Sequence, residues 1–237
     1  VEKDKADIKL HLSSGEVLLV SDLLIAAGRV PNIEQLALER AGVEYSEFGV
    51  IVDRKLRTTN RSVYAIGDIV EGSRFTHTAS YHAGIVLKKI LLGLPSKLRT
   101  DHIPQVTYTD PEIASVGMNF EDAVKRFGKK VERSFVNLKT NDRAITDSKT
   151  EGFVEVILLG RKVIGCSITS KNAGELISFW AFVIAKSIKI SNINAMVAPY
   201  PTLGEVNKRV ISEYYAPKVF SNKLLKNYVG IIQRFFK

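Results

Sequence analysis

The stretch Val63-Tyr64-Ala65-Ile66-Gly67-Asp68 is the most informative part of this 237-residue chain. Its four apolar residues form a short run, which is typical of a strand buried on both faces of a parallel sheet. Gly67 lets the backbone turn and a ligand approach closely. Asp68 then lies at the carboxyl end of the strand, where open α/β sheets bind their ligands. The alternative is a simple strand-ending turn, because Gly-Asp is a common turn signal.

A second apolar segment, residues 24–27, ends at Gly28 and is followed by Pro31-Asn32. Together the two strand ends resemble those of the pyridine nucleotide–disulfide oxidoreductases, the family of lipoamide dehydrogenase, glutathione reductase and mercuric reductase. The resemblance implies that the chain leaves an NAD(P)-binding domain near Gly28 and re-enters an FAD-binding domain near Gly67. It also implies that Asp68 hydrogen-bonds the ribityl chain of the flavin.

Residues 77–92 are predicted to form a helix, because Gly93 and Pro95 follow them and end it. The resemblance places the first turn of this helix, with His77, Thr78 and Ala79, against the flavin ring. The alternative for His77 is a residue that only makes a hydrogen bond at the helix start.

Upstream of this helix we predict a strand pair at residues 8–12 and 17–25, a short helix at 33–42 and a strand at 50–57. Downstream, residues 103–117 closely resemble the opening strand and turn of the family's dimerisation domain. Alternating patterns then predict an antiparallel sheet. The expected strands and helices of this part are a helix at 119–128, strands at 131–138, 153–159 and 162–169, and a helix at 172–188.

The predicted fold class is therefore α/β plus α+β. End segments of the NAD(P)-binding domain (1–32) and FAD-binding domain (33–100) precede an α+β dimerisation domain (101–216) and a basic tail (217–237). The resemblance implies a homodimer formed through residues 101–216.

Two features of the family are missing from the sequence. No two glycines lie two positions apart, so there is no GxGxxG turn for a dinucleotide pyrophosphate. Cys166 is the only cysteine, so the family's CxxxxC redox pair is also absent, and Cys166 itself is interpreted as inert packing. We therefore expect the chain to be the C-terminal half of a longer flavoenzyme that is inactive alone.

Residues 199–205 read Pro-Tyr-Pro-Thr-Leu-Gly-Glu. They resemble the family's His-Pro-Thr segment and its following Glu, but Tyr200 replaces the acid–base His, as it does in mercuric reductases. Tyrosine titrates near pH 10, so it is a poor base at neutral pH but can donate a hydrogen bond. Tyr200 and Glu205 are thus the candidate catalytic residues, with dimer packing as their alternative role. The resemblance also predicts a cis Tyr200–Pro201 bond.

The tail carries five of the chain's net nine positive charges and no acidic residue. From Phe220 onward its apolar residues recur at helical spacing, which predicts a basic amphipathic helix. Such a helix can lie on an anionic membrane surface or cover an apolar groove on its own dimer. We find no nucleic-acid motif. With no signal peptide or membrane-spanning run, the default location is the cytoplasm.

The function implied by the resemblance is an FAD-dependent NAD(P)H oxidoreductase that passes electrons through a disulfide to a small-molecule or disulfide acceptor. Its closest likeness is to the mercuric reductases, although the chain lacks their C-terminal cysteine pair, and no metal site is expected. Two alternatives remain. One is a non-catalytic dimerisation or membrane-docking module, and the other is a dihydrolipoamide dehydrogenase, which Tyr200 disfavours.

Overall fold

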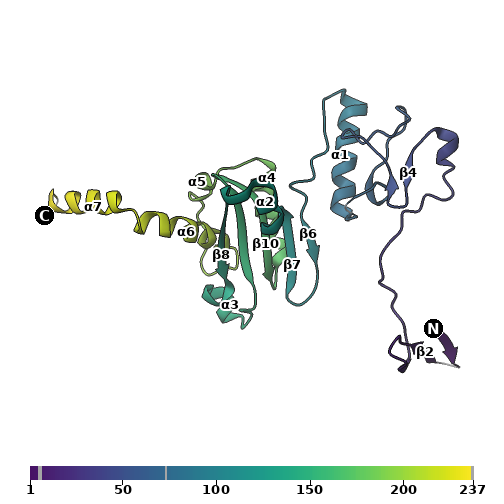
Figure 1. Cartoon of the computed structure of the whole chain (residues 1–237), viewed down its shortest axis with the longest axis horizontal. Helices are drawn as coiled ribbons and strands as arrows, with labels where there is room; N and C mark the ends of the chain where they lie inside the picture. Colours follow the sequence, from purple (N-terminus) through teal and green to yellow (C-terminus); the bar gives the residue numbers. More distant parts are fainter. Residues whose placement is uncertain (5–6, 73, 236–237) are drawn as a thin grey trace. The chain divides into compact units, whose positions relative to one another are not determined.

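The computed structural model describes residues 1–4, 7–72 and 74–235 (Figure 1). The chain divides into two compact units, Val1–Ala79 and Ser80–Lys237. This division falls inside the segment 33–100 that we assigned to the FAD-binding domain. The domain boundaries at 32/33, 100/101 and 216/217 stay predictions.

The first unit opens with a small antiparallel sheet. Its strands are β1 (Glu2–Asp4), β2 (Asp7–His11) and β3 (Val17–Val20), in that order. The predicted strand pair is confirmed, although its second strand ends at Val20. Four short elements follow, namely η1 (Leu38–Ala41), β4 (Tyr45–Ser46), β5 (Gly49–Val50) and η2 (Gly67–Ile69).

The buried parallel strands predicted for this unit are wrong. Residues 24–27 have no regular structure, and Leu24 is 89% exposed. The predicted strand 50–57 is reduced to β5, and the predicted strand 63–66 keeps a single bridge, from Tyr64 to Arg57. A parallel strand satisfies its backbone groups only through neighbouring strands. Among the described residues, the only parallel pairing is one bridge from Val50 to Val70, so these segments have no partners.

Helix α1 (Thr76–Leu92) agrees with the predicted helix at 77–92. It contains the division between the two units. The predicted helix at 33–42 is present only as the single 3-10 turn η1, which ends at Gly42 with a φ of 66°.

The second unit is built on a five-stranded antiparallel sheet with the order β6-β7-β10-β9-β8. This confirms the predicted α+β domain, and Gly160-Arg161 forms the hairpin turn between β9 and β10. The strands are β6 (Gln105–Thr107), β7 (Glu112–Gly117), β8 (Val131–Asn137), β9 (Phe153–Leu159) and β10 (Lys162–Ser170).

Helices pack on this sheet and close its core. Helix α4 packs on β7 and β10, and α6 packs on β8 and β9. Trp180 of α4 is fully buried and its indole N–H donates to Asn207 Oδ1 of α6 at 2.8 Å. The helical elements of this unit after α1 are α2 (Phe120–Phe127), η3 (Gly128–Lys130), η4 (Leu138–Thr140), α3 (Asp142–Thr146), α4 (Ala173–Ala185), α5 (Ile190–Ile193), α6 (Glu205–Phe220) and α7 (Lys223–Phe235).

Cys166 lies on β10 in the same core and is buried. Burial raises the pKa of its thiol well above the ordinary value, and the Glu155 carboxylate adds to this effect. The thiol therefore stays protonated at neutral pH and is a poor nucleophile. This agrees with a packing role for Cys166.

The predicted C-terminal helix is present as α7, after α6 ends at Phe220. Leu224, Tyr228 and Ile231 of this helix are 81%, 60% and 54% exposed in the single protomer, and its packing on a groove of the dimer stays a prediction. No described helix is both long and apolar enough to cross a bilayer.

Candidate functional site

The predicted flavin-contacting turn is centred on Gly67 in the first unit. Gly67 is buried and has a φ of 74°, a conformation that favours glycine. A Cβ added at this position would lie 3.2 Å from the Ala79 Cβ. Glycine therefore lets η2 approach the first turn of α1 closely, and Asp68 follows in η2.

Two arginines hold the segment after Gly28 against this turn. Arg29 Nη1 donates to Asp68 Oδ2 at 2.7 Å, and its Nη2 donates to the Arg74 carbonyl. Arg74 in turn donates to the carbonyl of Arg29 and, at 2.9 Å, to that of Phe48. The structure thus brings together the two segments whose ends carry the family resemblance, although they are 39 residues apart in sequence.

A cavity of about 360 Å³ adjoins this contact. Asp68 lines it, and its carboxylate is partly exposed, with 46% of the side chain accessible. An ionised carboxylate only accepts hydrogen bonds, so Asp68 is suited to a hydroxyl-rich group. The lining residues are Arg29, Val30, Pro31, Asn32, Asp68, Ile69 and Arg74. Gly28 is not among them.

The three predicted residues of the first helical turn have different environments. His77 is exposed and its ring stacks on Phe75, with centroids 5.2 Å apart. Thr78 is buried, and its Oγ1 has no hydrogen-bond partner among the described residues. Ala79 is the residue that faces Gly67. Of the three, only Ala79 is therefore shown to lie next to the Asp68 turn.

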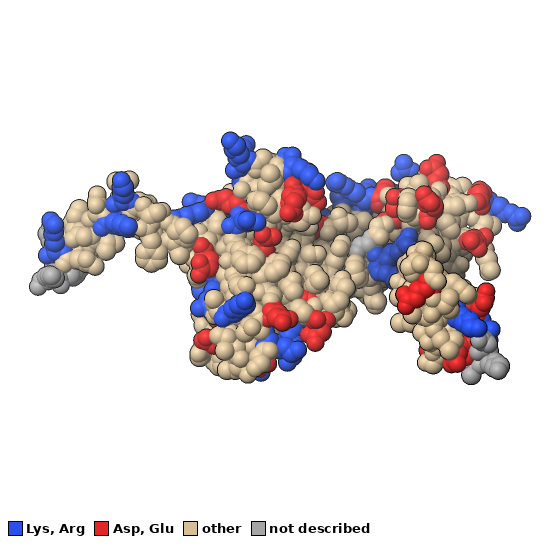
Figure 2. Space-filling model, turned by 60° about the horizontal axis from the view of Figure 1, so that its bottom comes forward, with Lys and Arg blue, Asp and Glu red and all other residues tan. Residues whose placement is uncertain are grey.

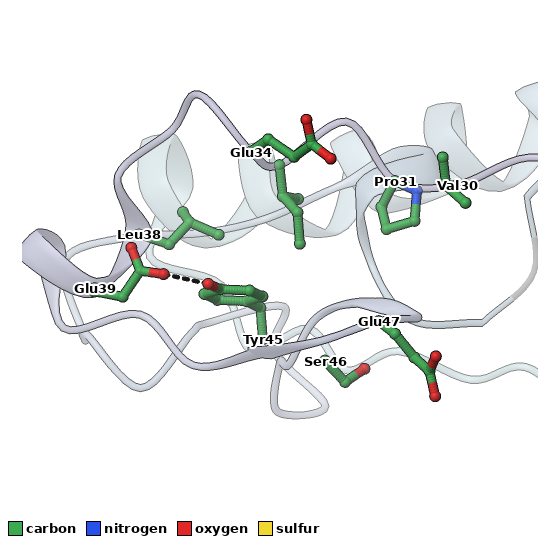
Figure 3. A pocket seen from close by; sticks show the side chains of 9 residues that line it. Val30, Pro31, Glu34, Leu38, Glu39, Tyr45, Ser46 and Glu47 are labelled. Carbon is green, nitrogen blue, oxygen red and sulfur yellow. Dashed lines mark hydrogen bonds between the residues drawn. The ribbon is translucent and has the colours of Figure 1, made fainter.

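Another hollow in the first unit, of about 320 Å³, lies between η1 and β4 (Figure 3). The Tyr45 ring lines it, and the Tyr45 hydroxyl donates to the Glu39 carboxylate. This hydrogen bond lowers the pKa of Glu39 and raises the pKa of Tyr45. None of the predicted site residues lines this hollow.

The Pro199–Glu205 segment forms the candidate site of the second unit. The Tyr200–Pro201 bond is cis, as predicted. Thr202 Oγ1 donates to the Pro199 carbonyl at 2.7 Å and closes the turn. The Tyr200 side chain is exposed, and its hydroxyl donates to Asp142 Oδ2 at 3.0 Å. This hydrogen bond to a carboxylate raises the pKa of Tyr200, so its hydroxyl stays protonated at neutral pH.

Buried Asn141 connects this segment to Glu205. Its Nδ2 donates to Glu205 Oε2 and to the Thr202 carbonyl, both at 3.2 Å. Its Oδ1 accepts from the Ala144 N–H at 2.9 Å and caps α3. Asn141 and Asp142 are adjacent, so one corner of the chain contacts both predicted catalytic residues. Sequence reasoning missed this corner, whose only signal is an Asn-Asp pair of the kind that begins a helix.

No group of three or more His, Cys, Asp or Glu side chains that could hold a metal ion occurs in the described part of the chain. The groups described at the two sites are hydrogen-bond donors and acceptors. These are the exposed Asp68 carboxylate in the first unit and the Tyr200 hydroxyl with the Asp142 and Glu205 carboxylates in the second.

Comparison with known proteins gives two family matches that together cover most of the chain. Residues 103–211 match the dimerisation domain of the pyridine nucleotide-disulphide oxidoreductases. Residues 1–83 match the pyridine nucleotide-disulphide oxidoreductase family itself.

Individual relatives agree with these matches. The chain is 31% identical to a mercuric reductase of Bacillus cereus over 211 residues, which cover 86% of this chain and 33% of that protein. It is 34% identical to a dihydrolipoyl dehydrogenase of Bacillus subtilis over 187 residues, which cover 78% of this chain and 39% of that protein. The chain thus spans between a third and two fifths of these relatives.

Solved structures also resemble this one. LpdA from Mycobacterium tuberculosis matches with a TM-score of 0.80 and 26% identity, covering 89% of this chain and 46% of that one. The HOCl-induced flavoprotein disulfide reductase RclA from Escherichia coli matches with a TM-score of 0.75 and 25% identity, covering 88% and 48% respectively.

Proposed function

The chain belongs to the pyridine nucleotide-disulphide oxidoreductase family, and from this premise we propose that it is the C-terminal half of an FAD-dependent NAD(P)H oxidoreductase. Within the family it is proposed to be a mercuric-reductase-like member. The observation that supports this proposal is the hydrogen bond from Tyr200 to Asp142, in a segment that resembles the one in which lipoamide dehydrogenases have the acid–base histidine.

Members of this family use FAD and NAD(P)H. The residues of the first unit fit the flavin, because Asp68 presents a partly exposed carboxylate and Gly67 allows a close approach. In the proposal, Asp68 accepts hydrogen bonds from the hydroxyls of the flavin's sugar chain. Gly28 and the first turn of α1, with His77, Thr78 and Ala79, complete this side of the flavin site. When bound, the flavin exchanges an electron pair with NAD(P)H.

Tyr200 is proposed to place a protonated hydroxyl, held by Asp142, at the acceptor site. The Tyr200 hydroxyl donates its proton in a hydrogen bond to Asp142, and this bond raises the pKa of Tyr200. Tyr200 therefore does not serve as a base near neutral pH. Glu205, held by Asn141, supplies a second carboxylate to the same corner. This arrangement disfavours the proton exchange that dihydrolipoamide oxidation needs from a histidine.

The dimerisation-domain match supports a homodimer formed through residues 101–216. In the proposal, Tyr200 and Glu205 face the partner subunit's redox site, and the cytoplasm is the proposed location. The 237-residue chain alone is expected to show no NAD(P)H oxidation, because it contains neither a GxGxxG turn nor a CxxxxC pair.

The test uses the product of the complete reading frame that contains this sequence. We expect a flavin absorption spectrum in the purified protein and NAD(P)H oxidation that depends on an added acceptor, either Hg(II) or a disulfide. Asp68→Ala should weaken flavin retention. Tyr200→Phe should keep the flavin but reduce acceptor-dependent turnover about 10- to 100-fold, which is typical of a lost hydrogen bond to a charged group.

Tyr108→Phe is the matched control, because Tyr108 is an exposed tyrosine of the same unit. It should leave both flavin content and turnover unchanged. A protein without flavin would refute the enzyme assignment and favour the dimerisation module. Efficient lipoamide reduction by the unsubstituted protein would contradict the mercuric-reductase-like assignment and favour a dihydrolipoamide dehydrogenase.

A further inference from the structure

Helix α7 has two chemically distinct faces. It begins after Asn222, whose Oδ1 accepts from the Leu225 N–H at 3.2 Å and caps the helix. At about 100° per residue, the apolar side chains fall on one arc of roughly 160°. The residues on this apolar face are Leu224, Leu225, Tyr228, Val229, Ile231 and Ile232, and the remaining arc holds Lys223, Lys226, Asn227, Gly230, Gln233 and Arg234.

Most of the apolar face of α7 is left uncovered by the described residues of the protomer. Five of its residues, Leu224, Leu225, Tyr228, Val229 and Ile231, are exposed. Burial of such side chains away from water is favourable in proportion to their apolar area, so an exposed row of them marks an interaction surface.

The polar face of α7 carries cations that have no counter-charge among the described residues. Lys223, Lys226 and Arg234 form no ion pair with any described residue, and the sequence has no Asp or Glu after Glu213. Figure 2 shows Lys and Arg but no Asp or Glu along this end of the chain. Lys218 differs, because it pairs with Glu132 of β8 at 2.6 Å and ties α6 to the sheet. In the part of the chain after Glu213, the positive charge that is available to a partner therefore lies on α7.

We propose that α7 docks the protein on an anionic lipid surface, lying flat with its apolar face in the acyl boundary. A bilayer interface matches both faces at once, since lipid tails accept the apolar residues and lipid phosphates attract the cations. A helix of 13 residues is about 20 Å long, too short to span the hydrocarbon core of a bilayer. A groove on a second copy of the chain would cover only the apolar face.

Vesicle co-sedimentation of the 237-residue chain tests this proposal and does not depend on enzyme activity. We expect the chain to sediment with phosphatidylcholine vesicles that contain 30% phosphatidylglycerol, and this binding should weaken as salt increases. Vesicles of phosphatidylcholine alone should bind much less. Lys223→Gln with Lys226→Gln should weaken binding to the anionic vesicles about 25-fold, at roughly fivefold for each cation lost.

A charge-matched control is Lys139→Gln with Lys171→Gln, because both lysines are exposed and lie outside α7. It should bind like the parent chain. On the helix itself, Leu224→Ser with Ile231→Ser should abolish most sedimentation. Asn227→Ser with Gln233→Ser, which alters the opposite face, should not.

Light scattering on the same variants separates lipid from a second copy of the chain. If Leu224→Ser with Ile231→Ser changes the oligomeric state and the parent chain does not bind anionic vesicles, α7 belongs to a dimer interface. The membrane proposal then fails. Equal binding by the two lysine double variants would also overturn it.

Discussion

At the scale of single residues, the Tyr200–Asp142 contact sets the chemistry of the residue that we propose in place of the family's acid–base histidine. A carboxylate that accepts the phenol proton stabilises the protonated form, and an anion beside it opposes formation of the phenolate. Both effects raise the pKa of Tyr200. Tyr200 is exposed, and the contact with Asp142 raises its pKa more than burial or the charge of Glu205 does.

Replacement of Asp142 should therefore lower the pKa of Tyr200 toward its ordinary value. The sign follows because Asp142→Asn removes the negative charge while keeping a side chain of the same shape. The measurement is tyrosinate absorbance during alkaline titration, taken as the difference between each protein and its Tyr200→Phe counterpart, which isolates one tyrosine of eight.

Asp147→Asn is the control, because Asp147 caps the C-terminal end of the same short helix and pairs with Arg143 at 2.9 Å. This variant should leave the pKa of Tyr200 unchanged. If Asp142→Asn also leaves the pKa of Tyr200 unchanged, the hydrogen bond does not set the protonation of Tyr200. The role proposed for Tyr200 then loses its physical basis.

At the scale of elements, paired glycines shape the sheet of the second unit. Gly165 of β10 lies opposite Gly117 of β7, next to a register shift between Val163 and Gly165. A Cβ at Gly165 would overlap the Met118 carbonyl oxygen. Because Gly165 has no side chain, the backbone of Met118, which lies between β7 and α2, can pack directly against β10.

Gly165→Ala should destabilise the second unit by about 3 kcal/mol, because rigid backbone must move to accept the methyl group. Urea denaturation followed by Trp180 fluorescence measures this, since Trp180 is the only tryptophan and is buried in the same core. The control is Gly84→Ala on α1, where an added Cβ meets open space. It should change the free energy of unfolding by less than about 1 kcal/mol. Equal free energies of unfolding for the two variants would contradict this role of Gly165.

The elements that sequence predicted well are those whose signals are local. Helices α1, α2 and α4 and strands β8 to β10 follow from apolar spacing over their own residues. The apolar segments 24–27 and 63–66 carry the same kind of signal, but a parallel strand also needs neighbouring strands. Asp142 could not have been linked to Tyr200, because 58 residues separate them and only the folded chain brings them together.

At the scale of the whole molecule, the two units differ in how much core each contains. The second unit has one large core that joins the sheet to α4 and α6. The first has a small core of Val43, Val50, Ala65 and Val70, with a few partly buried neighbours. Local stability follows the number of buried apolar contacts, so the first unit should open far more readily than the second.

Amide hydrogen exchange followed by mass spectrometry should show this difference directly. In the 237-residue chain, amides of β9 and β10 should exchange at least about 100-fold more slowly than those of β2 and β3. The protein made from the complete reading frame should protect residues 17–31 strongly, because the missing part is proposed to cover apolar residues such as Leu19, Leu24 and Ile25, which are exposed here. The β9 and β10 amides serve as the internal control, since their core is already complete. Unchanged exchange of residues 17–31 would mean that this surface stays open in the complete protein, and it would refute the proposal that the first unit is the end of two larger nucleotide-binding domains.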